Sequence, residues 1–210
     1  MYTVPIGVQS PVVVSANSHS LFLEWLPPVQ PNGIITIYNL FVGGTLSFSG
    51  LNTSAIVTDL LPYQQYTLTL QACTAIGCSS GPTVTNQTLP DSPQGLAPPI
   101  LVALGPTSVS ATWQPPVIPN GPILSYNLLQ LSGAGLTQSA VVYSGVGPQA
   151  TGTGLNPATL YFFSLVAYNA GGSVQSEASN VTTIESSPDG VLAPNVSVLN
   201  SPALVVSWST

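Results

Sequence analysis

The sequence predicts an all-β protein built from small domains in tandem. A Pro-x-Gly turn recurs at matching positions of a repeat, at residues 5–7, 93–95 and 188–190. Each of these prolines is followed 20 residues later by a tryptophan, namely Trp25, Trp113 and Trp208. Because the turns lie 88 and 95 residues apart, the repeat predicts a domain at 1–90, a second at 91–186 and the truncated start of a third at 187–210.

The charge of the chain is small and of one sign. No residue is Lys or Arg, and six are acidic: Glu24, Asp59, Asp91, Glu177, Glu185 and Asp189. Without cations no patch can neutralise phosphates, so the composition excludes nucleic-acid binding and attachment to anionic lipid. Three explanations for the missing cations stay open: resistance to trypsin-like proteases, a surface covered by neighbouring subunits or glycans, and a biased composition of this segment.

The hydrophobic residues are distributed as in a β-protein rather than in a membrane or disordered protein. No apolar run reaches the ~20 residues that a membrane helix needs, so no membrane insertion is expected in this segment. The N-terminus lacks the cationic region of a signal peptide. Since the chain ends two residues after Trp208, in the middle of a repeat, we expect it to be part of a longer polypeptide.

The tryptophans mark one strand in each unit. Residues 21–25 alternate as a half-buried strand does, and their counterparts are residues 109–113 and 204–208. A proline pair follows the first two strands, at 27–28 and 115–116. Proline has no backbone N–H to donate to a strand ladder, so each pair is expected to end its strand.

A turn and a second strand come next. The turn is Pro-Asn-Gly in both units, at 31–33 and 119–121, and Asn and Gly tolerate the positive φ of tight turns. The following strand carries Tyr38 or Tyr126, each 13 residues after its tryptophan.

A Leu-x-Pro-x-x-x-Tyr motif opens a late strand in each unit and ends in Tyr66 or Tyr161. The strand after it has a period of two, with alternate residues on one face: Tyr66, Leu68, Leu70 and Ala72. The opposite face carries Thr67, Thr69, Gln71 and Cys73. The second unit is seven residues longer before this motif, and we place the insertion in the loops around the middle strands.

The order of these motifs resembles the fibronectin type III domain over the whole chain. The resemblance implies tandem seven-stranded, immunoglobulin-like Greek-key sandwiches. It also implies that the hydroxyl of each corner tyrosine, Tyr66 and Tyr161, bonds back to nearby backbone. Residues 72–78, Ala-Cys-Thr-Ala-Ile-Gly-Cys, together with the Pro-Asn-Gly turns, look like usherin-type extracellular repeats. The core is expected to contain Trp25, Trp113, Trp208, Tyr38, Tyr126, Tyr66 and Tyr161.

The two cysteines fit a local disulfide. Cys73 ends one strand with its side chain outward and Cys78 begins the next, so a hairpin can bring the sulfurs together. The spacing is not that of a Cys-x-x-Cys redox motif, and two Cys with one His make a poor zinc site. No cofactor or metal is therefore expected.

Four Asn-x-Ser/Thr sequons are candidate sites of N-glycosylation in a secreted protein, at Asn52, Asn86, Asn180 and Asn195. Chance in a chain rich in Asn, Ser and Thr is the alternative explanation, and the many hydroxyls leave O-glycosylation open.

Catalysis finds no support in the remaining polar residues. His19 is the single histidine and lies in a predicted turn, where a solvated side chain is expected. Asp91 and Asp189 lie beside the repeat boundaries, but one acid at each is too few for a calcium site. The linkers at 89–93 and 185–188 contain proline and are expected to be short and semi-rigid.

Two kinds of function stay open. The first is a structural segment of an extracellular or cell-surface fibre, with other copies or subunits and glycans as partners. The second is a ligand-binding ectodomain, which would gather exposed aromatics at one loop end, whereas Phe48, Tyr63 and Tyr143 are scattered. An accessory region of a carbohydrate-active enzyme would need a catalytic domain elsewhere, because this sequence has no paired acid and base.

Overall fold

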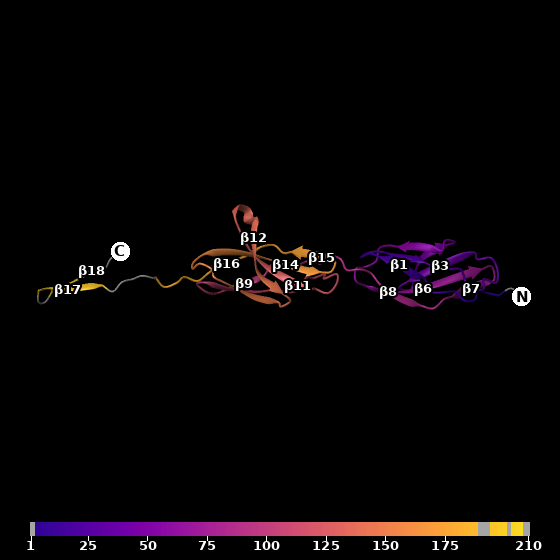
Figure 1. Ribbon diagram of the computed structural model, residues 1–210, viewed down its shortest axis with the longest axis horizontal. Helices are drawn as coiled ribbons and strands as arrows, with labels where there is room; N and C mark the ends of the chain where they lie inside the picture. The colour runs from indigo at the N-terminus through magenta and orange to yellow at the C-terminus, as the bar shows by residue number, and fades with distance from the viewer. Residues whose placement is uncertain (1–2, 189–193, 201–202, 208–210) are drawn as a thin grey trace.

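A computed structural model describes residues 3–188, 194–200 and 203–207. In that part of the chain the secondary structure consists of β-strands and one short 3-10 helix, so the all-β prediction is confirmed. The first two domains lie end to end along the long axis (Figure 1). No helix among the described residues is both long enough and apolar enough to cross a membrane.

The first domain contains two antiparallel sheets. The three-stranded sheet has the order β1-β2-β5, with bounds Val12–Ala16, Leu21–Glu24 and Ser54–Val57. The other has the order β4-β3-β6-β7, and β8 also pairs with β6. Its strands are β3 (Ile37–Val42), β4 (Thr45–Gly50), β6 (Gln65–Thr74), β7 (Gly77–Ser80) and β8 (Val84–Gln87).

The second domain repeats this arrangement. The three-stranded sheet has the order β13-β10-β9, with bounds Gln149–Thr153, Ser108–Thr112 and Ile100–Gly105. The other has the order β12-β11-β14-β15, and β16 also pairs with β14. Its elements are β11 (Ser125–Ser132), the 3-10 helix η1 (Ala134–Leu136), β12 (Gln138–Gly145), β14 (Leu160–Asn169), β15 (Gly172–Gln175) and β16 (Ser179–Thr182).

Each domain has eight strand segments rather than seven because the last strand is interrupted. Between β7 and β8, the Gly81 N–H donates to the Leu70 carbonyl at 2.8 Å, and a Cβ at Gly81 would stand 2.8 Å from the Val8 carbonyl oxygen. Between β15 and β16, the Ser176 hydroxyl accepts the Leu165 N–H at 3.0 Å. Both halves of the strand pair with the same neighbour, so the sandwich keeps its predicted order.

The tryptophans lie in the two cores. Trp25 is 4% exposed and packs between the rings of Tyr38 and Phe48, at centroid distances of 6.1 and 5.5 Å. Trp113 is likewise buried and packs against Tyr126 and Tyr143. Trp208 lies outside the described residues.

The corner tyrosines are half-buried, and their hydroxyls bond to the backbone. The Leu61 N–H donates to the Tyr66 hydroxyl at 2.8 Å, and the Asn156 N–H donates to the Tyr161 hydroxyl at the same distance.

The difference in length between the domains lies in one hairpin. β3 and β4 are joined by a tight turn, whereas β11 and β12 are longer and enclose η1. Since Tyr38 pairs with Gly50 and Tyr126 pairs with Gly145, the hairpin accounts for all seven additional residues.

Beyond the second domain, β17 (Asn195–Asn200) and β18 (Ala203–Ser207) form an antiparallel pair. The limits 1–90, 91–186 and 187–210 stay predictions.

Candidate functional site

The most elaborate set of polar contacts between distant residues lies at the joint between the two domains. On the side of the first domain, Nε2 of His19 is 2.9 Å from Oδ2 of Asp91 in the linker. The other ring nitrogen, Nδ1, is 2.9 Å from the Leu60 carbonyl oxygen. A histidine with an acceptor at each nitrogen is best satisfied when both carry a proton, so the ring favours its cationic form.

The pKa values shift accordingly. The pKa of His19 is raised above its usual value, first by the Leu60 carbonyl and then by the Asp91 carboxylate. The pKa of Asp91 is lowered, first by the N–H of Ser92 and then by His19. The side chains of His19 and Asp91 are 57% and 37% exposed, so solvent screens their attraction and the contact positions the linker more than it stabilises the fold.

Asn169, at the end of β14, holds the linker on the side of the second domain. Its Nδ2 group donates to the Asp91 carbonyl at 2.7 Å and to the Pro119 carbonyl at 2.8 Å. Its Oδ1 accepts the N–H groups of Gly171 and Gly172 at 2.8 and 2.9 Å. The side chain is buried and makes four hydrogen bonds, so it ties the linker to two turns of the second domain at once.

The Pro-Asn-Gly turns found in the sequence hold the segment that enters each domain. The Asn120 side chain donates to the Ser92 carbonyl at 2.8 Å, and the Asn120 carbonyl accepts the Asp91 N–H at 3.2 Å. In the first domain, the equivalent Asn32 side chain donates to the Val4 carbonyl at 3.0 Å. Both asparagines have positive φ, 49° and 55°, which directs the side chain toward this segment.

Glycine lets the linker lie close to the second domain. A Cβ at Gly171 would stand 2.6 Å from backbone atoms of Asp91, so a larger residue there must displace the linker. The equivalent position in the first domain is Ile76, and the equivalent of Asn169 is Thr74. The two domains therefore present different surfaces at their N-terminal ends.

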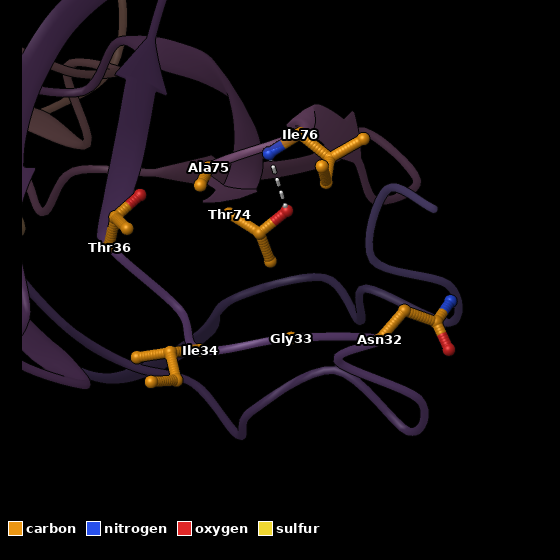
Figure 2. Close-up of a pocket in the computed structure, with 7 residues that line it drawn as sticks. All are labelled: Asn32, Gly33, Ile34, Thr36, Thr74, Ala75 and Ile76. Atoms are coloured by element: carbon orange, nitrogen blue, oxygen red, sulfur yellow. Dashed lines mark hydrogen bonds between the residues drawn. The ribbon is translucent and has the colours of Figure 1, made fainter. Parts of the chain in front are cut away.

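In the first domain this end forms an apolar pocket of about 450 Å³ between two turns (Figure 2). It is lined by Asn32, Gly33, Ile34, Thr36, Thr74, Ala75 and Ile76. Ile34 is 88% exposed, so the pocket is open to solvent on one side.

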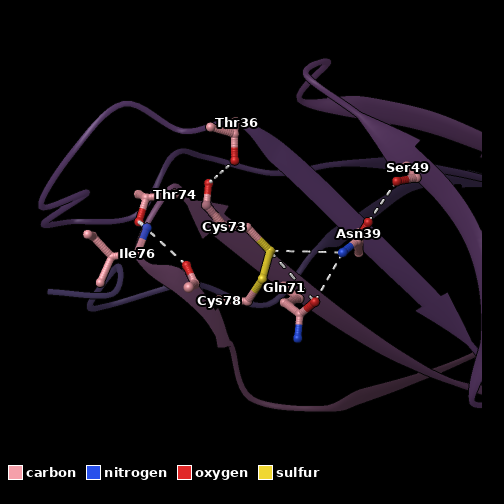
Figure 3. Close-up of a disulfide and its surroundings, with 9 residues drawn as sticks. Thr36, Asn39, Ser49, Gln71, Cys73, Thr74, Ile76 and Cys78 are labelled. Carbon is pink, nitrogen blue, oxygen red and sulfur yellow. Dashed lines mark hydrogen bonds between the residues drawn. A yellow bond between two sulfur atoms is a disulfide. The ribbon is translucent and has the colours of Figure 1, made fainter.

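Cys73 and Cys78 form a disulfide between β6 and β7, with an S–S distance of 2.03 Å (Figure 3). The two residues are register partners, as the hairpin argument predicts. Cys73 lies on the outward face but is only 4% exposed, and Nδ2 of Asn39 is 4.0 Å from its sulfur. The second domain has Tyr168 and Ser173 at these paired positions.

The four sequons differ in accessibility. Asn52, Asn180 and Asn195 have exposed side chains. Asn86 is half-buried in β8, pairs with Tyr66, and its Oδ1 accepts the Gln87 N–H at 2.7 Å. Room for a glycan is therefore smallest at Asn86.

Two buried threonines at the corners were missed by the sequence analysis. Oγ1 of Thr88 donates to the Leu61 carbonyl at 2.6 Å and accepts the Gln64 N–H at 3.0 Å. Thr183 makes the same two bonds with Asn156 and Thr159. Each threonine follows its corner tyrosine by 22 residues, and alignment of the two repeats on these tyrosines would have revealed the match.

The comparisons with known proteins agree with this architecture. The model of the fibronectin type III domain matches residues 7–86 and 91–184. The chain belongs to the fibronectin type III family. It is 33% identical to rat usherin over 98% of the chain and to human usherin over 97%, and 31% identical to chicken protein sidekick-2 over 87%. It spans 4% of the length of each usherin and 9% of sidekick-2.

A binding or structural site fits these residues better than a catalytic one. Both nitrogens of His19 face acceptors, so neither is placed to take a proton from a nucleophile. Within the described ranges, no group of three or more His, Cys, Asp or Glu residues could hold a metal ion. The fibronectin type III match covers most of the chain and is a match to a non-catalytic domain.

Proposed function

We propose that this chain is a non-enzymatic structural segment of a long extracellular protein, in which it acts as a rigid spacer and as a lateral assembly surface. The observation that carries the proposal is the joint, where the linker is hydrogen-bonded to both domains. Asp91 contacts His19 through its carboxylate and Asn169 through its carbonyl. A linker bound on both sides transmits the orientation of one domain to the next, as a spacer requires.

The covalent features support an extracellular location. Disulfides persist in oxidising compartments, and Cys73 and Cys78 form one here. The exposed sequons at Asn52, Asn180 and Asn195 have room for N-linked glycans, which we propose as covalent partners together with O-linked sugars. The proposed protein partners are other copies or subunits of an assembly, since a surface almost without charge suits burial between subunits.

The alternative function is an ectodomain that recognises a protein or glycan through its loops. The pocket of the first domain favours it, because the pocket is apolar and lies between the turns at 31–34 and 74–77. The equivalent end of the second domain, however, holds residues 90–92 of the linker. The pocket is therefore better explained as a seat for a preceding segment of an array than as a ligand site.

Small-angle X-ray scattering on the whole chain tests the spacer. The wild-type curve is expected to fit a single orientation of the first two domains. Asn169→Ala removes the side chain that ties Asp91 to the second domain, and the curve is then expected to need a spread of orientations. Asn39→Ala, which removes a hydrogen-bonded asparagine on the outer face of β3, is the matched control. A wild-type chain that already needs a broad ensemble of orientations would refute the rigid spacer.

A further inference from the structure

An unusual apolar stripe lies on the three-stranded sheet of each domain. On β1, Val12 and Val14 are 65% and 53% exposed, and we call them the first-domain stripe. On β9, Ile100, Val102 and Leu104 are 65%, 56% and 57% exposed, and we call them the second-domain stripe. Outward residues of antiparallel sheets are normally polar, and edge strands normally carry charges that prevent association.

The outward face of the other sheet in the first domain is mixed rather than a continuous apolar stripe. There Phe41 pairs with Leu46, which is 52% exposed, whereas Asn39, Gln71 and Ser49 are hydrogen-bonded to one another. Asn39 donates to Gln71 at 3.0 Å and accepts from Ser49 at 2.7 Å. Val12 and Ile100 are equivalent positions, 88 residues apart, so the apolar stripe recurs with the repeat.

Charge distinguishes the two stripes. In the first domain, Val12 pairs with Glu24, which is exposed and in turn pairs with Ser54. In the second domain, the cross-strand partners at the equivalent positions are Ile100, Thr112 and Gln149, all uncharged. Residues 92–176 contain no Asp, Glu, Lys, Arg or His at all.

This difference disfavours one of the three possible pairings between two copies, and of the other two only the pairing of unlike stripes covers the stripes of both domains. First-domain stripes placed face to face would bring two Glu24 carboxylates together, and like charges in an interface oppose association. A first-domain stripe on a second-domain stripe sets Glu24 against an uncharged sheet. There the hydroxyl of Thr112 and the amide of Gln149 can donate hydrogen bonds to it.

We propose that two copies of this chain associate laterally through these sheets, with the first-domain stripe of one copy packed on the second-domain stripe of another. The inference rests on the proposed function, since it names the surface and the partner of the lateral assembly. The proposed partner on each stripe is a second copy, because each copy carries both stripes. A different partner with basic side chains would find no acidic side chain to pair with on the second-domain sheet.

Sedimentation velocity up to about 1 mM chain, after enzymatic removal of any N-glycans, tests the inference. Wild type is expected to self-associate. Val14→Lys alone and Val102→Glu alone are each expected to weaken association about tenfold or more, because each places a charge in an apolar contact. An equimolar mixture of the two variants is expected to recover association, since the introduced charges then face each other. Thr67→Lys and Ser144→Glu, at exposed positions of the other sheets, are the matched controls.

Three outcomes would overturn the inference. If the wild-type chain stays monomeric at about 1 mM, two copies do not associate and the inference is wrong. Variants that associate as strongly as wild type place the contact on another surface, in which case the inference fails while the proposed lateral assembly stands. A mixture that associates no better than either variant excludes the pairing of unlike stripes. The rigid spacer is tested separately by scattering, so its failure is not confused with any of these.

Discussion

The buried threonines at the corners provide the sharpest test of how the fold is held. Thr183 is 3% exposed, and its hydroxyl donates to the Asn156 carbonyl at 2.6 Å and accepts the Thr159 N–H at 3.0 Å. Thr183→Val keeps the shape of the side chain but leaves that carbonyl and that N–H without their partner.

The two backbone partners are only partly buried, so each lost hydrogen bond is worth about 1 kcal/mol and we expect Thr183→Val to lower the free energy of unfolding of the second domain by about 2 kcal/mol. For a domain of this size, 1 kcal/mol shifts Tm by about 4–8 °C, which gives a decrease of about 8–16 °C.

Differential scanning calorimetry of the whole chain measures this shift. Thr88→Val is the equivalent change in the first domain, so the two variants identify which transition belongs to which domain. Thr183→Ser keeps the hydroxyl and loses one methyl group, worth about 0.8 kcal/mol, and is the control. If Thr183→Val proves as stable as Thr183→Ser, water satisfies the two backbone groups and the reasoning is wrong.

Three further predictions concern the disulfide, the joint and the glycans. Reducing the bond between Cys73 and Cys78 opens a short loop and is expected to lower the stability of the first domain alone by about 2 kcal/mol, seen as a lower Tm for that transition. Because the pKa of His19 is raised in the fold, the protonated ring, which can donate to both Asp91 and Leu60, is present at low pH, and its contact with the linker weakens as pH rises through that pKa. Scattering should show a narrower spread of domain orientations at about pH 5 than at about pH 8, and no such difference in a His19→Gln variant. Mass spectrometry of chain secreted from eukaryotic cells should find higher glycan occupancy at the exposed Asn180 than at the half-buried Asn86, and equal occupancy would contradict the accessibility argument.

The sequence predicted what local pattern encodes. The period of two placed Leu68 and Leu70 inside, and both are fully buried. The disulfide could be predicted because Cys73 and Cys78 are five residues apart and one hairpin joins them. The contact of His19 with Asp91 spans 72 residues and depends on how two domains meet, which no pattern within one domain encodes.

In the proposed assembly, the joint and the stripes together determine whether the copies form a closed pair or an open array. Each copy offers one first-domain stripe and one second-domain stripe, so pairing of unlike stripes either closes as an antiparallel pair or continues from copy to copy as an open array. The choice depends on the angle between the two sheets, which is set where Asn169 and Gly171 hold the linker against the second domain. A fixed angle selects one of the two outcomes, whereas a loose joint allows a mixture. Asn169→Ala should therefore change the distribution of assembled species without touching a stripe, and a distribution identical to that of wild type would mean that the angle between the sheets is set elsewhere.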